Sequence, residues 1–282
     1  MTTYTPSTLQ SLLLGTARLF FGRKRAKKLE HAMLYNKQRA EWLAKGGKIT
    51  RTRRILKDYA DTAGAATGHY FHQDLLVAKL IHDAKPKRHI DIGSRVDGFV
   101  AHVASFRPIE VLDVRPLTRS VHENITFTQA DLMFPQDIGQ TDSLSCLHAI
   151  EHFGLGRYTD PIDVEGHTKG IANLVDLVAP GGRLYISFPI GLADEVHFNA
   201  HRVFHPESIF AHPSIAAHMT LTRFDYVDDA GDLHLDRSVS DAVGKARYGC
   251  GIYTFYEGTV TCGPQAGMKY TFRLYLSNLT LL

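Results

Sequence analysis

Apolar residues recur along the middle of the chain with two different spacings. In residues 72–84 (HQDLLVAKLIHDA) and 99–106 (FVAHVASF) they lie three and four positions apart, which predicts helices with one buried face. Each of these segments is followed by a short apolar run, HIDIG at 89–93 and IEVLDV at 109–114, and each run predicts a buried strand.

The same order of elements continues toward the C-terminus. Residues 125–128 and 143–147 predict two more strands, and the apolar spacing in 164–178 predicts a helix that ends before the strand RLYISF at 183–188. Strands that alternate with helices predict a parallel sheet covered on both faces. Two later aromatic-rich runs, LTRFDYV and GIYTFYE, lack a crossover helix and predict an antiparallel hairpin at the edge of the sheet.

The N-terminal part differs from this α/β region in charge. Residues 1–60 hold 14 Lys and Arg against three acids, a net charge of +11, whereas the rest of the chain carries −8. The small residues of 62–68 (TAGAATG) mark the boundary between the two parts. We therefore predict a basic helical N-terminal extension, residues 1–67, and one α/β domain, residues 68–282.

The apolar stretch of the extension, residues 9–21, is short for a transmembrane span, and its basic residues follow it instead of preceding it as in a secretory signal. We predict a cytoplasmic protein whose residues 9–28 make peripheral contact with the anionic inner membrane. A solvated basic helix packed on the domain is the alternative. Nucleic acid is not expected as a partner, because the segment lacks the interleaved aromatic residues of base readers. The three cysteines are scattered and form no Cys-x-x-Cys pair, which agrees with a reducing compartment.

Ligands of open α/β sheets bind at the carboxyl ends of the strands, so the residues that follow each predicted strand are candidate site residues. The segment GSRVDG lacks the Lys and Ser/Thr of a phosphate-binding P-loop. Arg95 stands where a dinucleotide-binding turn has its second glycine. Nucleoside triphosphate and NAD sites are therefore both disfavoured.

Acidic residues follow the second and third predicted strands. Asp113 comes 22 residues after Asp91, and a carboxylate at this place suits the two hydroxyls of a ribose. Asp131 is placed to accept from an adenine amine, with the Leu132 amide addressing the ring. A ligand with adenine and ribose but no phosphate fits this pattern.

The runs HIDIG, VLDV, QADL and PGGRLYISFP resemble those of class I S-adenosylmethionine-dependent methyltransferases over about residues 68–191. The resemblance implies a Rossmann-like fold, with a mainly parallel seven-stranded sheet and an antiparallel C-terminal hairpin. It implies S-adenosyl-L-methionine as cofactor, with Asp91, Gly93 and Ser94 on the methionine part, Asp113 on the ribose, and Asp131 and Leu132 on adenine. It also places His148 beside the sulfonium.

More closely, LHAIEHFGLGRYTDPID at 147–163 is similar to the hallmark region of the bacterial family catalogued as domain of unknown function 268. Members of that family often accompany surface-polysaccharide genes, which implies a small-molecule or lipid-linked glycan as acceptor.

The same stretch contains His148, Glu151 and His152 in the spacing H-x-x-E-H. An inverted zinc peptidase needs this spacing inside a long helix, whereas FGLGRYTDP, which follows it, is not helical. We instead predict a turn after the fourth strand, with His152 as general base and Glu151 as the carboxylate that orients it. A metal-dependent hydrolase using the three residues is kept as an alternative.

A second histidine cluster, HFNAHRVFH, places His197, His201 and His205 four residues apart, on one face if the segment is helical. There His201 would assist catalysis or help to bind a divalent metal. We disfavour the metal, because Pro206 interrupts the run. Polar substrate contacts are predicted for Arg157, Tyr158, Asp160 and Arg202.

These observations predict an O-methyltransferase that acts on a sugar hydroxyl during surface polysaccharide synthesis. A non-catalytic protein that binds S-adenosylmethionine or another nucleoside, or that serves as a scaffold of the same system, is the alternative from another functional class.

Overall fold

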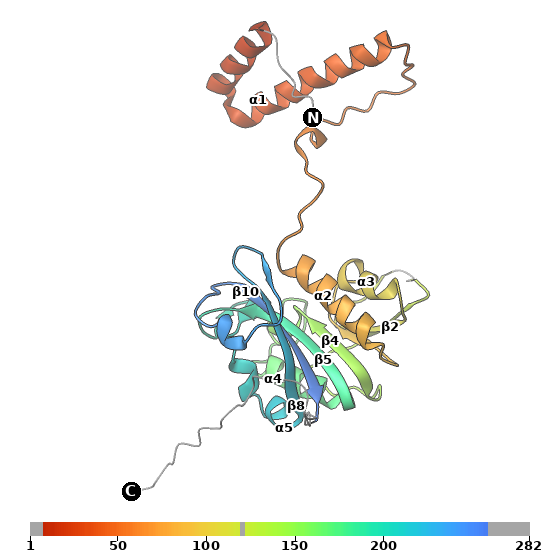
Figure 1. The fold of residues 1–282 in the computed structure, drawn as a ribbon, viewed down its shortest axis with the longest axis vertical. Helices are drawn as coiled ribbons and strands as arrows, with labels where there is room; N and C mark the ends of the chain where they lie inside the picture. The colour runs from red at the N-terminus through yellow and green to blue at the C-terminus, as the bar shows by residue number, and fades with distance from the viewer. Residues whose placement is uncertain (1–7, 119–121, 259–282) are drawn as a thin grey trace. The chain divides into compact units, whose positions relative to one another are not determined.

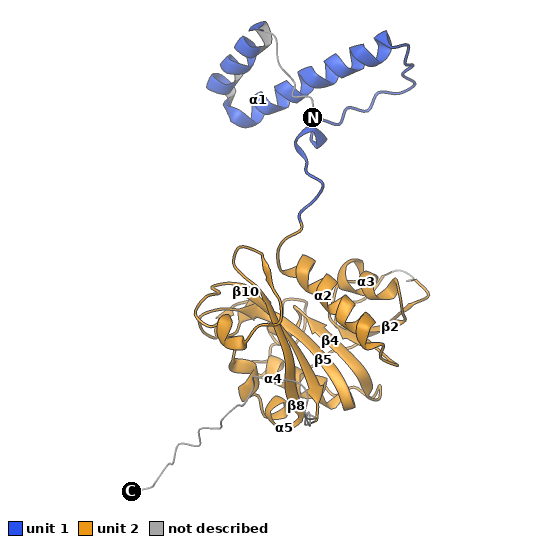
Figure 2. Ribbon diagram, in the orientation of Figure 1, with its two compact units in different colours: residues 1–65 blue, residues 66–282 orange. Residues whose placement is uncertain are grey.

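The computed structural model describes residues 8–118 and 122–258. The chain divides into two compact units, residues 1–65 and residues 66–282, which Figure 2 shows in different colours. The division falls inside the small-residue stretch 62–68, where the sequence places the end of the basic extension.

The first unit contains one long helical element, α1 (Thr8–Ala44), and a single 3₁₀ turn, η1 (Asp58–Ala60). Gly22 interrupts α1 with non-helical angles (φ 78°, ψ 163°), so α1 consists of two helices joined at a kink. The chain after α1 returns to the second helix, where the His31 imidazole lies 2.8 Å from the Leu56 carbonyl and the Arg54 guanidinium stacks over the Tyr35 ring. Among the described residues, no helix combines the length and the hydropathy that a membrane crossing requires.

The second unit is built on an eight-stranded sheet with the strand order β3-β2-β1-β4-β5-β10-β8-β9 (Figure 1). The strands are β1 (Ile90–Ile92), β2 (Ile109–Asp113), β3 (Ile125–Gln129), β4 (Thr141–Leu147), β5 (Val178–Ile190), β8 (Met219–Val227), β9 (Leu233–His234) and β10 (Gly249–Glu257). The first five in spatial order are parallel, and β10 is antiparallel to both β5 and β8. The predicted Rossmann-like α/β fold with antiparallel C-terminal strands is therefore confirmed.

Two details of the sheet differ from the prediction. Among the described residues the main sheet has eight strands instead of seven, because the two-residue strand β9 extends its edge beyond β8. The antiparallel pair is also not an edge hairpin, since β10 lies between β5 and β8. All residues of β10 from Gly249 to Phe255 are buried, which explains why its sequence is apolar without polar alternation.

Helices cover both faces of this sheet. On one face α2 (His69–Ala84), the turn η2 (Val96–Val100) and the short α3 (Ala101–Ala104) bury Ile81, Phe99 and Val103 in the same core as Tyr185 of β5. On the other face α4 (Gly166–Asp176), the turn η4 (Ser208–Ala211) and α5 (Pro213–His218) pack on a core that contains Ile186 of β5. Successive side chains of β5 point to opposite faces of the sheet, so β5 contributes residues to both cores.

The segment HFNAHRVFH is not helical. It forms an antiparallel hairpin of β6 (Glu195–His197) and β7 (His201–Val203), in which His197 and His201 are cross-strand partners. The two rings lie 5.2 Å apart because the hairpin pairs them, and His205 lies beyond β7. The three histidines therefore do not form the helical stack that their spacing suggests.

Candidate active site

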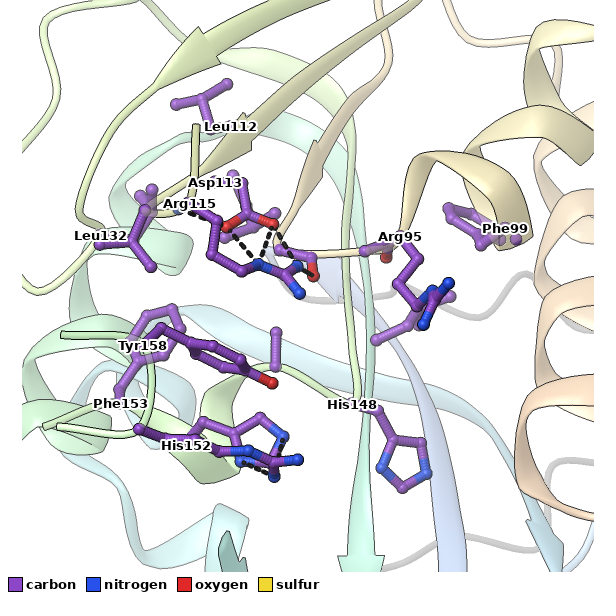
Figure 3. A pocket seen from close by; sticks show the side chains of 18 of the residues that line it. Arg95, Phe99, Leu112, Asp113, Arg115, Leu132, His148, His152, Phe153 and Tyr158 are labelled. Atoms are coloured by element: carbon purple, nitrogen blue, oxygen red, sulfur yellow. Dashed lines mark hydrogen bonds and ion pairs between the residues drawn. The ribbon is translucent and has the colours of Figure 1, made fainter. Parts of the chain in front are cut away.

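The order of the strands reverses between β1 and β4, and a cavity of about 610 Å³ opens at the carboxyl ends of the strands there. Gly93 after β1, Asp113 at the end of β2, Asp131 after β3 and His148 after β4 all line this cavity. Figure 3 labels Asp113 and His148 among the lining residues. The remaining predicted residues on its wall are Ser94, Leu132, His152, Arg157, Tyr158 and Asp160. The prediction that four strand ends converge on one hollow agrees with this geometry.

The turn after β1 is shaped by Gly93 and Asp91. Gly93 has a φ of 77°, and a side chain there would place its Cβ 2.7 Å from the Cβ of Ala149, so glycine is required for both reasons. The Asp91 carboxylate accepts hydrogen bonds from the Ser94 amide (3.1 Å), the Ser94 hydroxyl (2.9 Å) and the Ser145 hydroxyl (2.5 Å). Asp91 is fully buried behind the wall and is not among the residues that line the cavity, so this position does not support the predicted direct contact with a ligand.

Burial also changes the acidity of this carboxyl group. Removal from water raises the pKa of Asp91 to about 7, although the hydrogen bonds from Ser145 and Ser94 act in the opposite direction. Through its hydrogen bonds to Ser94, Asp91 stabilises the turn that places Gly93 and Ser94 on the cavity wall.

Arg95, where a second glycine is usual in nucleotide-binding turns, does not fill the cavity. Its guanidinium pairs with Asp97 at 2.8 Å, and its side chain is 73% exposed. The turn therefore accommodates this residue by directing the charged group toward solvent.

Asp113 is buried and already paired. Its carboxylate accepts from the Arg115 amide at 2.8 Å and from Nε of the Arg115 guanidinium at 2.9 Å, and it also pairs with Nη2. Nη2 donates in addition to the Gly93 carbonyl at 3.0 Å, and the guanidinium lies 4.8 Å from the centre of the Tyr158 ring (Figure 3). Arg115 thus bridges the ends of β1 and β2, and a ribose at Asp113 has to displace it or share the carboxylate with it.

The third strand end offers one free acceptor. Asp131 Oδ1 accepts from the Met133 amide at 2.9 Å, which fixes the turn, and the described contacts leave Oδ2 without a partner. Leu132 is buried, and its carbonyl accepts from the Asn173 side chain at 2.8 Å. Asn173 on α4 therefore locks the backbone of the loop whose Leu132 amide was predicted to face adenine.

The turn HAIEH is short, as predicted. Residues 150–152 form a single 3₁₀ turn, η3 (Ile150–His152), and not the long helix of an inverted zinc peptidase. Glu151 is fully buried, and its Oε1 lies 2.8 Å from Nδ1 of His148 but 3.7 Å from Nε2 of His152. The carboxylate thus orients His148 and not His152, which corrects the predicted pairing.

His152 is held by a different partner. Its Nδ1 donates to the Ala200 carbonyl at 2.8 Å, so Nε2 carries the lone pair of the neutral ring. Burial lowers the pKa of His152, Glu151 raises it, and Arg157 lowers it further, with a net decrease. At neutral pH this imidazole on the cavity wall is therefore an unprotonated acceptor.

The predicted substrate contacts fall into two groups. Arg157 and Tyr158 line the cavity, with the Arg157 guanidinium over the Tyr158 ring. Asp160 stabilises the loop, because its carboxylate accepts from the Gly154, Gly156 and Tyr158 amides. Arg202 lies outside the cavity: it is buried and donates to the Phe153 carbonyl at 2.7 Å. Arg202 instead lines a second cavity, of about 520 Å³, so its predicted substrate contact stays a prediction.

His201 also lies outside the cavity lining. Its ring centre is 6.5 Å from that of His152 and 5.4 Å from that of Tyr248, and its buried Nε2 has no hydrogen-bond partner among the described residues. A direct role of His201 in the cavity is not supported by this position.

Sequence patterns did not indicate the contribution of α2 to the wall. Tyr70, Gln73 and Asp74 line the cavity from the first turns of this helix. Burial raises the pKa of Asp74. In the sequence these residues lie at the start of a predicted amphipathic helix and follow no predicted strand. The signal that could have identified them is that polar residues occur on the apolar face of this helix.

Comparisons with known proteins give one family match and several similar solved structures. A family model described as "Caenorhabditis protein of unknown function, DUF268" matches residues 119–237, less than half of the chain. This is the family number that the LHAIEH segment suggested, but the description does not support a bacterial family. No curated protein matches the chain significantly.

Solved structures similar to the chain include three methyltransferases. The N-methyltransferase NodS of Bradyrhizobium japonicum WM9, in complex with S-adenosyl-L-homocysteine, is 13% identical over 74% of this chain and 94% of NodS, with a TM-score of 0.46. CalS10, an amino pentose methyltransferase of Micromonospora echinaspora, is 14% identical over 75% of this chain and 100% of CalS10, with a TM-score of 0.44. The 1,6-didemethyltoxoflavin-N1-methyltransferase of Burkholderia thailandensis is 14% identical over 82% of this chain and 91% of its own, with a TM-score of 0.45. Identities of this size assign no activity to this chain.

Proposed function

We propose that the protein is an S-adenosylmethionine-dependent O-methyltransferase. The observation that carries this proposal is the single cavity at the ends of β1, β2, β3 and β4, lined by Gly93, Asp113, Asp131 and His148. Its volume of about 610 Å³ is within the usual range for a small-molecule site. The Asp113 and Asp131 carboxylates on its wall can accept from the hydroxyls and the amine of an adenosine.

S-adenosylmethionine supplies a methyl group on a cationic sulfur, and the protein has to align an acceptor oxygen and remove its proton. His152 is the base that the geometry favours, because the bond to Ala200 leaves the ring's lone pair on Nε2, which the acceptor would share with a long 3.5 Å contact from Arg157. The new bond joins the acceptor oxygen to the methyl carbon as the carbon–sulfur bond breaks, and the proton passes to Nε2. The products are a methyl ether and S-adenosylhomocysteine.

We propose a sugar hydroxyl of a surface polysaccharide precursor as acceptor. Arg157 and Tyr158 give the cavity a polar and aromatic wall beside His152, which suits a hydroxylated ring with an apolar face. The sugar class itself comes from the resemblance of the segment 147–163. The alternative, a non-catalytic protein, predicts that S-adenosylmethionine binds but that its methyl group is transferred to no extracted glycan.

Calorimetric titration with S-adenosylhomocysteine tests the cavity. Wild type should bind one equivalent, and Asp113→Ala should weaken binding by about 10- to 100-fold, because charge-assisted hydrogen bonds to the ribose contribute about 1.5–3 kcal/mol. Asp83→Ala removes a carboxylate from the exposed side of α2 and should bind as wild type does.

The Asp113→Ala variant also releases Arg115, so a second variant separates the two effects. Arg115→Gln leaves the carboxylate in place and removes the group that occupies it. It should bind S-adenosylhomocysteine at least as tightly as wild type. Weak binding by wild type, or equal binding by wild type and Asp113→Ala, would contradict the proposed ligand.

We also propose that the first unit contacts anionic membrane. Leu12, Leu13, Leu19 and Phe20 are exposed on α1, with Phe20 79% exposed, and the basic run Arg23–Lys28 follows them. This combination suits the interface of a bilayer with acidic headgroups. The full chain should float with phosphatidylglycerol-containing vesicles and not with neutral vesicles. Replacing Leu19 and Phe20 with Ser should abolish flotation. Unchanged flotation of that variant would show that the basic residues alone bind the vesicles and would contradict the apolar contact.

A further inference from the structure

We propose that His69, His148 and Cys250 form a binding site for a divalent cation of the zinc class, at the edge of the candidate active site. A ring nitrogen of each histidine and the sulfur of Cys250 all lie within 4.8 Å of one another. None of the sequence patterns brings these three residues together, because they come from the start of α2, the residue after β4 and the second residue of β10.

His148 lacks the partner that its environment requires. Its Nδ1 is bound to Glu151, and its side chain is only 4% exposed, yet Nε2 has no hydrogen-bond partner among the described residues. A buried polar atom without a partner costs about 1–3 kcal/mol, whichever protonation state the ring adopts. A cation held by Nε2 removes this cost.

The Glu151 carboxylate gives a second, independent indication. Its side chain is 1% exposed, and its Oε2 has no hydrogen-bond partner. Within residues 8–118 and 122–258, the ion pairs of this carboxylate are with His148 and His152 alone, and no Lys or Arg side chain reaches it. Oε2 of this buried carboxylate therefore lacks a described donor, and a divalent ion on His148 would add positive charge beside it.

The surroundings of the three residues match what metal ligands usually have. Glu151 bound to the far nitrogen of His148 is the carboxylate–histidine arrangement that fixes the ring of a ligating histidine. The Cys250 sulfur is 3.8 Å from Oε1 of Gln73, which lines the cavity. The His69 and His148 rings are nearly parallel, 14° apart, with centres separated by 5.3 Å. One ring has to rotate for both nitrogens to direct their lone pairs at one ion, because an imidazole binds a metal in its ring plane.

The donor set indicates the kind of ion. Two imidazoles and one thiolate suit zinc and similar borderline metals, and disfavour magnesium and calcium, which take oxygen ligands. Bonds of about 2.1 Å to nitrogen and 2.3 Å to sulfur separate tetrahedral ligands by about 3.5 Å. Closing the site thus needs side-chain movements of about 1 Å.

Three protein ligands leave a fourth position open, as in catalytic zinc sites. His148 lies on the cavity wall, so an acceptor hydroxyl in the cavity is near enough to occupy this position and to lose its proton more readily there. This part of the inference rests on the proposed methyl transfer. The binding of the metal does not, and the two are tested separately.

Titration of chelator-treated full-length protein with Co²⁺ tests the site. Wild type should bind one equivalent and develop the absorption band of a thiolate–cobalt bond, and Zn²⁺ should displace the Co²⁺. Cys250→Ser should lose the band, and His69→Gln should weaken binding at least 100-fold. Glu151→Gln should keep the band and weaken binding by about 10- to 100-fold, the usual effect of removing the partner of a ligating histidine. Cys146→Ser and Cys262→Ser are the matched controls and should behave as wild type.

Two results would overturn the site. One is the absence of the band in wild-type protein that is folded by circular dichroism. The other is a band that survives in Cys250→Ser and disappears in either cysteine control. Titration of the same metal-free protein with S-adenosylhomocysteine gives an independent answer on the proposed function, so failure of one proposal is distinguishable from failure of the other.

Discussion

Between about pH 5 and about pH 8, the unfolding free energy of wild type should fall by about 3 kcal/mol relative to that of the Asp91→Asn variant. Burial raises the pKa of Asp91 from 3.8 to about 7, so between these values the folded state binds a proton that the unfolded state releases. The contribution of this group to stability is therefore complete below pH 3.8 and is lost as the pH rises through about 7. Over the whole interval it amounts to about 4 kcal/mol.

Urea unfolding of both proteins at several pH values measures this effect. Other titrating groups contribute equally to the two proteins, so the difference between their pH profiles isolates Asp91. Wild type should lose stability relative to Asp91→Asn as the pH rises. Parallel profiles, or a wild type that gains stability relative to the variant, would show that Asp91 is ionised in the fold at neutral pH.

Replacing His152 with Gln should slow methyl transfer by about 10²- to 10⁴-fold, the usual contribution of a positioned general base. Its affinity for S-adenosylhomocysteine should change little, because the proposed ribose and adenine contacts lie on other strands. Transfer of labelled methyl from S-adenosylmethionine to extracted lipid-linked glycans provides the assay. His205→Gln, outside the cavity lining, is the matched control.

The pH profile of the rate gives a further check on His152. Burial and Arg157 lower its pKa, so the fall in kcat/KM on the acid side should occur below the ordinary imidazole value of about 6.5. A variant as active as wild type, or a profile that falls above pH 7, would assign the base to another group.

The positions of the strand ends could be predicted from the sequence, because buried parallel strands are short apolar runs and their carboxyl ends share one edge. Gly93, Asp113, Asp131 and His148 each follow such a run, and all four line the cavity. The turn at 148–152 was predictable for a similar local reason, since glycines and a proline follow it and no long helix can form.

The partners of the charged residues were not predictable in the same way. Glu151 is close in sequence to both His148 and His152. It binds His148 because of the left-handed backbone at His148 (φ 48°) and the single 3₁₀ turn that follows. Asp113 is the last residue of β2 and lines the cavity, whereas Asp91 lies in the middle of β1 and is buried behind the wall. From the sequence, a ligand contact was expected for both carboxylates, and Glu151 was expected to orient His152.

Contacts between distant segments were beyond local patterns altogether. Cys250 meets His148 only because β10 is inserted between β5 and β8, and local sequence does not specify that strand order. The histidines of 197–205 have helical spacing, but cross-strand pairing in the β6–β7 hairpin determines their positions. Tertiary pairing overrides such short periodic signals.

A crystal structure of the full chain soaked with S-adenosylhomocysteine is the most direct measurement of the cavity's role. The ribose should lie within hydrogen-bond distance of Asp113, with Arg115 moved away from that carboxylate, and adenine should lie beside Asp131 and Leu132. Density for the ligand elsewhere, or an empty cavity with the Asp113–Arg115 pair intact at saturating ligand, would contradict an adenosyl site at these four strand ends.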